Sequence, residues 1–328
     1  MRVLVTGGTG FTGAALVERL CRDGHDVVAL DVHEGIRRDE LQDVGADVVL
    51  GSVTDEELVE RCVEGADAVM HVAAAFRELN VSEEHYDRVN VEGTRIVLDA
   101  AIAAGVTRFV YCSTCGVHGH VEDPPADEDA PIAPADYYQR SKYEGEPLVR
   151  RAHERGDVRA VVLRPAAIYG PGDPGRFLML FRWADRGWFP MFGDGSTYYH
   201  PVYIDNLVDA FVACLDEERL TGRPYLIADD RYLTIEELVR AVGRAIGRDV
   251  RVLHLPITPL VAAGHVVERA CRPLGIEPPI FPRRVDWYRQ DRAFDISRAR
   301  RELDYEPRVS LEEGLRRTGE WYRTNGYL

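Results

Sequence analysis

The first apolar run of the chain leads directly into three glycines at every third position. The run Arg2–Thr6 is followed by Gly7, Gly10 and Gly13, and then by an amphipathic stretch near residues 11–23. Glycine at such positions allows a tight turn, close approach of the backbone to a pyrophosphate, and close packing of a helix on a strand. The amide N–H groups at the start of a helix also favour an anion there. The pattern therefore predicts a strand–turn–helix unit that binds the phosphates of a dinucleotide.

The order of segments in the first half of the chain extends this unit into a sheet. Helical stretches alternate with short apolar runs, and such alternation is typical of βαβ units in a parallel sheet. We expect an α/β fold, with a Rossmann doubly wound parallel sheet and a smaller C-terminal substrate-binding lobe. The expected strands are 2–6, 26–31, 47–50, 68–72, 107–113 and 158–164, and the expected helices are 11–23, 37–43, 55–63, 83–104 and 137–155.

The composition of the chain changes after residue 165. Proline, glycine and aromatic residues cluster between Pro165 and Tyr203, as in loops around a binding cleft. We expect a dinucleotide-binding Rossmann domain at 1–165, completed by about 201–228, and a substrate-binding lobe made of 166–200 and 229–328. Within these segments the sequence predicts a helix near 204–218, a strand near 223–228, and a core or lid helix from Pro259 to Leu274.

The charge of the chain restricts its partners. A formal charge of −15 and a pI near 5.2 argue against nucleic acids and anionic membranes, because both bind basic surfaces. No apolar stretch reaches the ~18 residues expected of a membrane span, and the chain opens directly into a strand rather than a signal peptide. Six dispersed cysteines fit a reducing cytosol, so we expect a cytoplasmic protein. Cys112 and Cys115 form a C-x-x-C, but no second pair completes a zinc site, and we predict no metal.

A carboxylate ends the second predicted strand, 18 residues beyond Gly13. Asp31 at this position would accept hydrogen bonds from the adenosine ribose and repel a 2′-phosphate, which favours NAD over NADP. Arg37 and Arg38 offer the alternative, since they would serve a 2′-phosphate if their loop folds back. We expect NAD as the cofactor.

Lys142 is the only lysine in a chain with 39 arginines, and it follows Tyr138 by four residues. Positions i and i+4 share one face of a helix, so the ammonium and the phenol project into the same space. A nearby cation favours the phenolate of a tyrosine, whose pKa is ordinarily about 10. The pair therefore predicts a proton-transfer site, although taken alone it also fits a chance pair on a solvated helix face. Tyr137 has no lysine four residues on.

These features resemble the extended short-chain dehydrogenases/reductases, a family that includes nucleotide-sugar epimerases and 3β-hydroxysteroid dehydrogenases. The likeness runs nearly end to end. The resemblance implies that Thr114, Tyr138 and Lys142 are the catalytic residues. The segments that carry it, besides the glycines, are His71–Ala74, Asn90–Thr94, Ser113–Gly119, Tyr138–Lys142, Arg164–Gly172, His200–Asn206 and Phe294–Leu303.

The same resemblance implies a set of cofactor contacts. The family's usual acid in the loop after the third strand is Ser52 here, which leaves Ser52 and Val53 as candidates for the adenine contact. His118 replaces a usual tyrosine, either as a structural histidine or as a substrate contact. The implied contacts are Gly7, Gly10, Phe11, Thr12, Gly13, Asp31, Ser52, Val53, Ala73, Ala74, Tyr138, Lys142, Pro165 and Ile168.

Departures from the family's motifs restrict which reactions and substrates we expect. Dehydratases carry an Asp-Glu pair directly after the catalytic threonine, and Cys115 and Gly116 stand there instead, which argues against elimination. UDP-sugar enzymes commonly place an arginine where this chain has Tyr199. Aromatic side chains near this position fit either stacking on a substrate ring or plain packing. The arginines that could substitute as diphosphate ligands are Arg176, Arg182 and Arg292.

We therefore expect an NAD-dependent oxidoreductase that transfers hydride between nicotinamide and a secondary alcohol or ketone through a Thr-Tyr-Lys triad. The alternative is a nucleotide-sugar epimerase that retains its NAD. A non-catalytic dinucleotide-sensing protein is a third possibility, against which the intact Tyr-Lys pair argues. The expected substrate is a small molecule, either a sugar nucleotide or a sterol-like alcohol or ketone. By resemblance, we also expect a homodimer formed through helices near 90–104 and 137–155.

Overall fold

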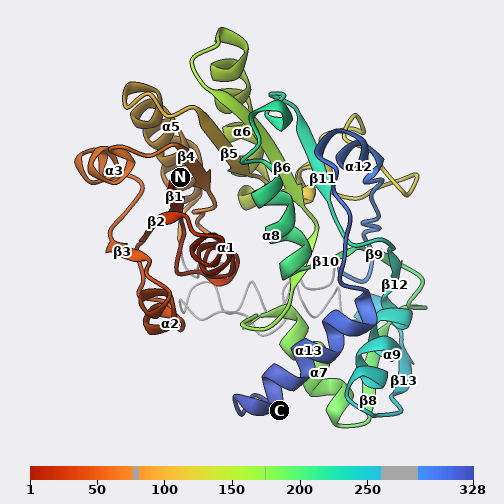
Figure 1. Cartoon of the computed structure of the whole chain (residues 1–328). Helices are drawn as coiled ribbons and strands as arrows, with labels where there is room; N and C mark the ends of the chain where they lie inside the picture. The colour runs from red at the N-terminus through yellow and green to blue at the C-terminus, as the bar shows by residue number, and fades with distance from the viewer. Residues whose placement is uncertain (77–80, 174, 260–286) are drawn as a thin grey trace.

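Seven parallel strands form the central sheet of the computed structural model, which describes residues 1–76, 81–173, 175–259 and 287–328. The strand order is β11-β6-β5-β4-β1-β2-β3 (Figure 1). The chain runs outward from β1 to β3 and then crosses back to place β4 on the other side of β1. The strands are β1 (Arg2–Thr6), β2 (Asp26–Asp31), β3 (Asp47–Leu50), β4 (Ala68–His71), β5 (Arg108–Cys112), β6 (Arg159–Pro165) and β11 (Pro224–Ile227).

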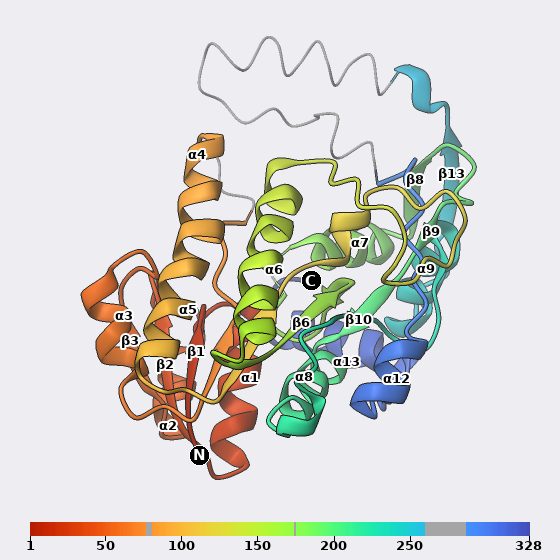
Figure 2. The same cartoon turned by 90° about the horizontal axis from the view of Figure 1, so that it is seen from above.

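Helices cover both faces of this sheet (Figures 1 and 2). Side chains alternate between two buried layers, because successive residues of a strand point to opposite faces. In β1, Val3 and Val5 join one core and Leu4 joins the other. The first core lies under α1 (Phe11–Arg22), α2 (Arg38–Asp43) and α8 (Ile204–Ala213), and the second under α3 (Glu56–Val63), α5 (Gly93–Ala103) and α6 (Tyr137–Arg155). The predicted Rossmann fold is thus confirmed.

The predicted helix at 83–104 contains an irregularity that the sequence pattern did not indicate. It consists of α4 (Glu83–Tyr86), the π-helical turn η1 (Asp87–Glu92) and α5. The helix predicted near 204–218 is also shorter than expected, because α8 ends at Ala213 and the short helix η3 (Glu217–Arg219) follows. The other predicted helices and strands of the first half agree with the structure to within about one residue.

Helix α6, which carries the Tyr-Lys pair, has clear signals at both ends. The side chain of Asp136 accepts a hydrogen bond from the amide of Gln139 at 2.9 Å and caps the first turn. Gly156 ends the helix in the left-handed conformation, with φ of 78°. These caps fix where the face bearing Tyr138 and Lys142 begins.

The second half of the chain adds short strand pairs beside the sheet. Strand β7 (Ala167–Tyr169) pairs with β10 (Pro201–Tyr203), β9 (Tyr198–Tyr199) with β12 (Leu233–Thr234), and β8 (Trp188–Phe192) with β13 (Arg251–Leu255). The accompanying helices are α7 (Arg176–Asp185), α9 (Ile235–Ala245), α12 (Ser297–Leu303) and α13 (Leu311–Thr324). The helix predicted from Pro259 to Leu274 lies, apart from Pro259, outside the described residues.

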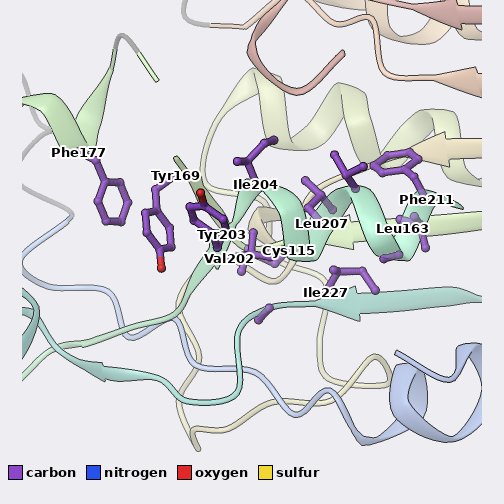
Figure 3. Close-up of a cluster of buried hydrophobic side chains, with 14 of the residues drawn as sticks. Cys115, Leu163, Tyr169, Phe177, Val202, Tyr203, Ile204, Leu207, Phe211 and Ile227 are labelled. Carbon is purple, nitrogen blue, oxygen red and sulfur yellow. The ribbon is translucent and has the colours of Figure 1, made fainter. Parts of the chain in front are cut away.

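An aromatic core joins these strand pairs to the sheet (Figure 3). The rings of Tyr169 and Phe177 stack at 4.6 Å, and Tyr203 meets Tyr169 edge-on at 5.4 Å. Cys115 belongs to the same buried cluster, so its thiol is part of the core. Cys112 and Cys115 are not joined in a disulfide. Within the described ranges, no group of three or more His, Cys, Asp or Glu residues is arranged to hold a metal, and no helix is long and apolar enough to cross a bilayer.

Candidate active site

The glycine loop lies where the chain changes direction across the sheet. Strand β1 pairs with β2 on one side and β4 on the other, and in open α/β sheets ligands bind beyond the carboxyl ends of strands at such a switch point. A Cβ on Gly7 would stand 2.8 Å from the amide nitrogen of Ala73, and one on Gly13 only 1.9 Å from the carbonyl oxygen of Gly7. Packing therefore excludes any side chain at these two glycines.

Gly10 is different, because space remains beside it. A Cβ there would lie 3.4 Å from the Gly7 oxygen and 3.9 Å from Oδ2 of Asp31, both ordinary contact distances. Gly10 also precedes the first turn of α1, and no side chain in the described part of the chain caps that helix. The amide groups at its start, which include Phe11 and Thr12, thus remain available to an anion. The glycine loop Gly7–Gly13 and these amide groups, together called the cradle, fit the pyrophosphate of a dinucleotide.

The carboxylate of Asp31 is fixed at the rim of this cradle. It accepts hydrogen bonds from the amide of Thr9 at 3.1 Å and from the amide of His33 at 3.2 Å. The two nearby arginines are engaged with other carboxylates. Arg37 pairs with Glu18 and, at 2.7 Å, with Glu40, and Arg38 pairs with Glu34.

The other predicted cofactor contacts lie in the loops after β3, β4 and β6. Ser52 accepts a hydrogen bond from the amide of Thr54 at 3.1 Å. Val53 is 5% exposed, and its methyl group occupies the space that a Cβ on Gly93 would need. The remaining positions carry small or apolar side chains next to the sheet. They are Ala73 and Ala74, both partly buried, Pro165 at the end of β6, and Ile168, which is in register with Val202.

Thr114 follows β5 and stands beside the start of α6. Its hydroxyl accepts a hydrogen bond from the amide of Gly116 at 3.1 Å, which leaves the hydroxyl proton for another acceptor. The short helix η2 (Cys115–His118) packs on α6 through Gly116, where a Cβ would lie 3.0 Å from Cγ of Gln139. Gln139 is the neighbour of Tyr138, so Thr114 and Tyr138 are held at one end of the same helix pair.

Lys142 is the most unusual side chain of the site. It is 1% exposed, and its Nζ has no hydrogen-bond partner among the described residues. The nitrogen lies 4.3 Å from the centre of the Tyr111 ring. Burial lowers the pKa of Lys142 to about 8. A buried ammonium without acceptors fits a bound group that brings its own oxygens, such as the ribose of a nicotinamide nucleotide.

Tyr138 is half-buried and borders an apolar surface. Its ring lies 4.7 Å from that of Phe76 at an interplanar angle of 58°. Phe76 is itself 51% exposed, so the phenol of Tyr138 has an aromatic neighbour near the protein surface.

A buried ion pair between Arg164 and Glu146 lies next to the site, one helical turn after Lys142 on α6. Arg164 donates to Glu146 through Nε at 2.9 Å and through Nη2 at 2.6 Å, and the hydroxyl of Ser113 donates to the same carboxylate at 2.6 Å. His118 accepts from Arg164 at 3.1 Å and uses its other ring nitrogen on the carbonyl of Pro131 at 3.2 Å. Both nitrogens of His118 are therefore occupied within the protein, as expected of a structural histidine.

Three residues of this arrangement were assigned no role from the sequence. Glu146 continues the spacing Tyr138, Lys142, Glu146, so the i,i+4 rule could have identified it. Asn90 accepts from the amide of Ala75 at 2.7 Å and donates to Ser141 at 2.9 Å, which ties η1 to the residue before Lys142. Tyr111 carried no local signal, because it approaches Lys142 only through the packing of β5 on α6.

The chain is similar to known proteins along nearly its whole length. Residues 3–228 match the NAD dependent epimerase/dehydratase family. A 3beta-hydroxysteroid-dehydrogenase/decarboxylase of Arabidopsis thaliana is 31% identical over 96% of this chain and 78% of its own length. A UDP-glucose 4-epimerase of Mycolicibacterium smegmatis is 32% identical over 98% of this chain and 99% of its own. The crystal structure of a dTDP-glucose 4,6-dehydratase of Streptomyces venezuelae, solved with NAD, superposes with a TM-score of 0.78 at 28% identity, covering 99% of this chain and 98% of that one.

Proposed function

Because the chain belongs to the NAD-dependent epimerase/dehydratase family, and its relatives are NAD-dependent enzymes, we propose that it is an oxidoreductase acting on a secondary alcohol or ketone. The observation that carries the proposal is that Lys142, four residues after Tyr138 on α6, is buried and its Nζ has no hydrogen-bond partner among the described residues. A surface lysine paired with tyrosine by chance would be solvated. The burial of Lys142 instead suits a group reserved for a ligand.

Each residue of the proposed Thr-Tyr-Lys triad has a separate task. Tyr138 accepts the proton of the alcohol, or donates it to the ketone oxygen in the reverse direction. Lys142 stabilises the phenolate electrostatically, since a neighbouring positive charge favours the ionised form of tyrosine. The hydroxyl of Thr114 donates to the substrate oxygen, while its own oxygen is held by Gly116. When bound, NAD would supply the acceptor or donor of hydride.

The chain's own residues favour NAD over NADP. The Asp31 carboxylate is held at the cradle by two amide groups, where it would accept from ribose hydroxyls and repel a 2′-phosphate. Arg37 and Arg38 are paired with carboxylates, so a 2′-phosphate would have to displace those partners. Around this cradle we propose cofactor contacts from the glycine loop, Ser52, Val53, Ala73, Ala74, Pro165 and Ile168.

The surroundings of Tyr199 and of the candidate diphosphate-binding arginines favour a substrate without a diphosphate. Tyr199 is 3% exposed and packs against Phe177 and Trp287, at the position where UDP-sugar enzymes commonly carry an arginine. Arg182 donates to the carbonyl of Tyr327 at 3.2 Å, and Arg292 donates to Gln290 at 2.6 Å. The Arg176 side chain lies outside the described part of the structure.

The ring of Phe76 beside Tyr138 also favours a substrate without a diphosphate. The aromatic ring of Phe76 packed against the phenol suits a hydrocarbon ring better than a charged nucleotide. We therefore propose a sterol-like or other apolar secondary alcohol or ketone. The residues 166–200 and 229–328 would form the lobe that encloses it.

A pair of adjacent tyrosines provides the test with its control. We expect Tyr138→Phe to lower kcat by at least about 10²-fold while NAD still binds, because only the proton-transferring hydroxyl is lost. Tyr137→Phe removes the same group from the preceding, exposed residue and should leave turnover intact. Turnover would be followed as reduced nicotinamide with a hydroxysteroid and simpler secondary alcohols. Full activity of Tyr138→Phe would refute the assignment.

The similarity to a UDP-glucose 4-epimerase defines the competing proposal. An epimerase oxidises and re-reduces one carbon, so it retains its cofactor and produces no net reduced nicotinamide. Incubation with UDP-glucose and analysis of both product and cofactor therefore separates the two activities. Epimerised product with no net redox change would favour the epimerase.

A further inference from the structure

The ring of Tyr111 lies against the charged end of Lys142. Tyr111 is fully buried in β5, three residues before Thr114, and its ring centre is 4.3 Å from Nζ. Its hydroxyl donates to the main-chain carbonyl of Lys142 itself at 3.0 Å. One side chain thus contacts both the backbone and the ammonium of the lysine. We propose that Tyr111 is a positioning residue that holds Lys142 in place and in its charged form; this inference rests on the proposed function of that site.

The need for such a residue follows from the surroundings of the ammonium. Burial of Lys142 opposes its charge, because the ammonium loses its water. The face of an aromatic ring carries negative potential and attracts a cation most strongly where water is excluded. The Tyr111 ring therefore offsets part of the desolvation that its own position helps to cause.

Other titratable groups near Lys142 do not supply a free negative charge. From β5, burial raises the pKa of Cys112 to about 11, so its thiol is neutral. From α6, the carboxylate of Glu146 is already bound by Arg164 and Ser113. Tyr138, also on α6, carries a negative charge only in the phenolate form that the proposed reaction uses.

The group that faces Lys142 from β4 is His71, and its hydrogen bonds make it neutral. Thr94 donates its hydroxyl proton to the carbonyl of Asn90 at 2.7 Å, so it accepts from Nε2 of His71 at 2.9 Å. Nδ1 of His71 then accepts from the hydroxyl of Thr6 at 2.7 Å. Burial, with the nearby ammonium, lowers the pKa of His71 well below its usual value. Among the described neighbours, the ring of Tyr111 therefore presents negative potential directly to Nζ, in addition to the charge of Glu146, which also favours the ammonium.

Packing leaves Tyr111 little freedom to move. A Cβ on Gly145 would lie 2.3 Å from the Tyr111 hydroxyl oxygen, so glycine at this turn of α6 is what admits the hydroxyl. On its other side the ring stacks on His71 at 5.8 Å, with an interplanar angle of 24°. The ring is thus a rigid surface under the lysine, and its effect on the ammonium is fixed by the fold.

The single lysine allows a direct test that needs no substrate. Trace acetic anhydride modifies only the neutral amine, and after denaturation the endoproteinase Lys-C cuts an unmodified chain at Lys142 alone. The uncut fraction, measured against pH in the NAD-free protein, therefore gives the titration midpoint of Lys142. The exposed amino group of Met1 serves as the internal reference for reagent strength.

The expected result is a shift of this midpoint to lower pH in Tyr111→Leu. Loss of the ring should raise the acid dissociation constant of Lys142 about tenfold, which corresponds to ~1.4 kcal/mol. From a wild-type midpoint near pH 8, labelling at pH 7 relative to its plateau would rise roughly fivefold. Tyr111→Phe keeps the ring and should restore the wild-type midpoint.

Two further variants keep the test decisive. Tyr305→Leu removes another buried tyrosine whose hydroxyl donates to a main-chain carbonyl, that of Ala228 at 2.9 Å, and should leave the midpoint unchanged. If Tyr111→Leu fails to fold, Tyr111→pentafluorophenylalanine reverses the ring potential at similar shape and should lower the midpoint relative to Tyr111→Phe. A midpoint that coincides with the control in these variants would overturn the inference. Failure of the proposed function would appear separately, as full turnover in Tyr138→Phe.

Discussion

Removing one partner of the buried ion pair beneath the site should destabilise the protein strongly. Arg164→Met keeps an unbranched side chain but leaves the Glu146 carboxylate without its guanidinium. The two side chains are 3% and 1% exposed, so solvent cannot replace the lost partner. Breaking a buried pair in this way costs about 3–5 kcal/mol.

This loss of unfolding free energy can be converted into a decrease in melting temperature. An unfolding entropy of about 2.1 cal/mol/K per residue amounts to roughly 0.7 kcal/mol/K for a chain of 328 residues. We therefore expect the melting temperature of Arg164→Met, measured by circular dichroism, to fall by about 4–7 °C. The double variant Glu146→Leu with Arg164→Met removes both charges of the pair and should recover at least half of the loss.

An exposed pair provides the control for this measurement. Arg240 and Glu236 pair on α9, one turn apart, with side chains 47% and 26% exposed. Arg240→Met should cost less than about 1 kcal/mol, or roughly 1 °C, since solvent screens this pair. The reasoning would be refuted if Arg164→Met melted like this control, or if the double variant were no more stable than the single one.

The remaining predictions test the glycine cradle, the choice of cofactor and a buried carboxyl. Gly10→Ala should fold normally but weaken NAD binding at least about tenfold in a fluorescence titration, because its Cβ fills the space facing Asp31. Gly13→Ala places a Cβ 1.9 Å from the Gly7 oxygen and should instead lose about 3 kcal/mol in urea unfolding. Asp31→Ser should shift the ratio of kcat/KM for NAD over NADP towards NADP by about tenfold, and an unchanged ratio would exclude Asp31 from the choice of cofactor. Burial raises the pKa of Asp229 from 3.8 to about 6, so its protonated form favours the folded state and that contribution is lost as the pH rises through about 6. Thermal scans should therefore find a smaller loss of stability between about pH 4 and about pH 6 in Asp229→Asn than in the wild type, and parallel curves would contradict this sign.

The parts of the fold that could be predicted are those with local causes. Alternating apolar runs and helical stretches predicted six strands of the sheet closely, because side-chain periodicity is a property of neighbouring residues. The π-helical turn at Asp87–Glu92 escaped prediction, since the hydrogen bonds of Asn90 to Ala75 and Ser141 join segments far apart in the chain. The sequence also left open whether Arg37 and Arg38 are available to a 2′-phosphate, because their partners depend on how the loop folds. In the structure, Arg37 pairs with Glu18 and Glu40, and Arg38 pairs with Glu34.

The fold class, the glycine cradle, and the face that Tyr138 shares with Lys142 follow from the amino-acid pattern, because each depends on spacings within one strand, turn or helix. The surroundings of Lys142 depend instead on how distant segments pack. Tyr111 lies 31 residues away in the chain, and Arg164 lies 18 residues from Glu146. Burial removes solvent from all of these groups at once, and it thereby makes the charge of Lys142 depend on side chains whose proximity no local pattern reveals.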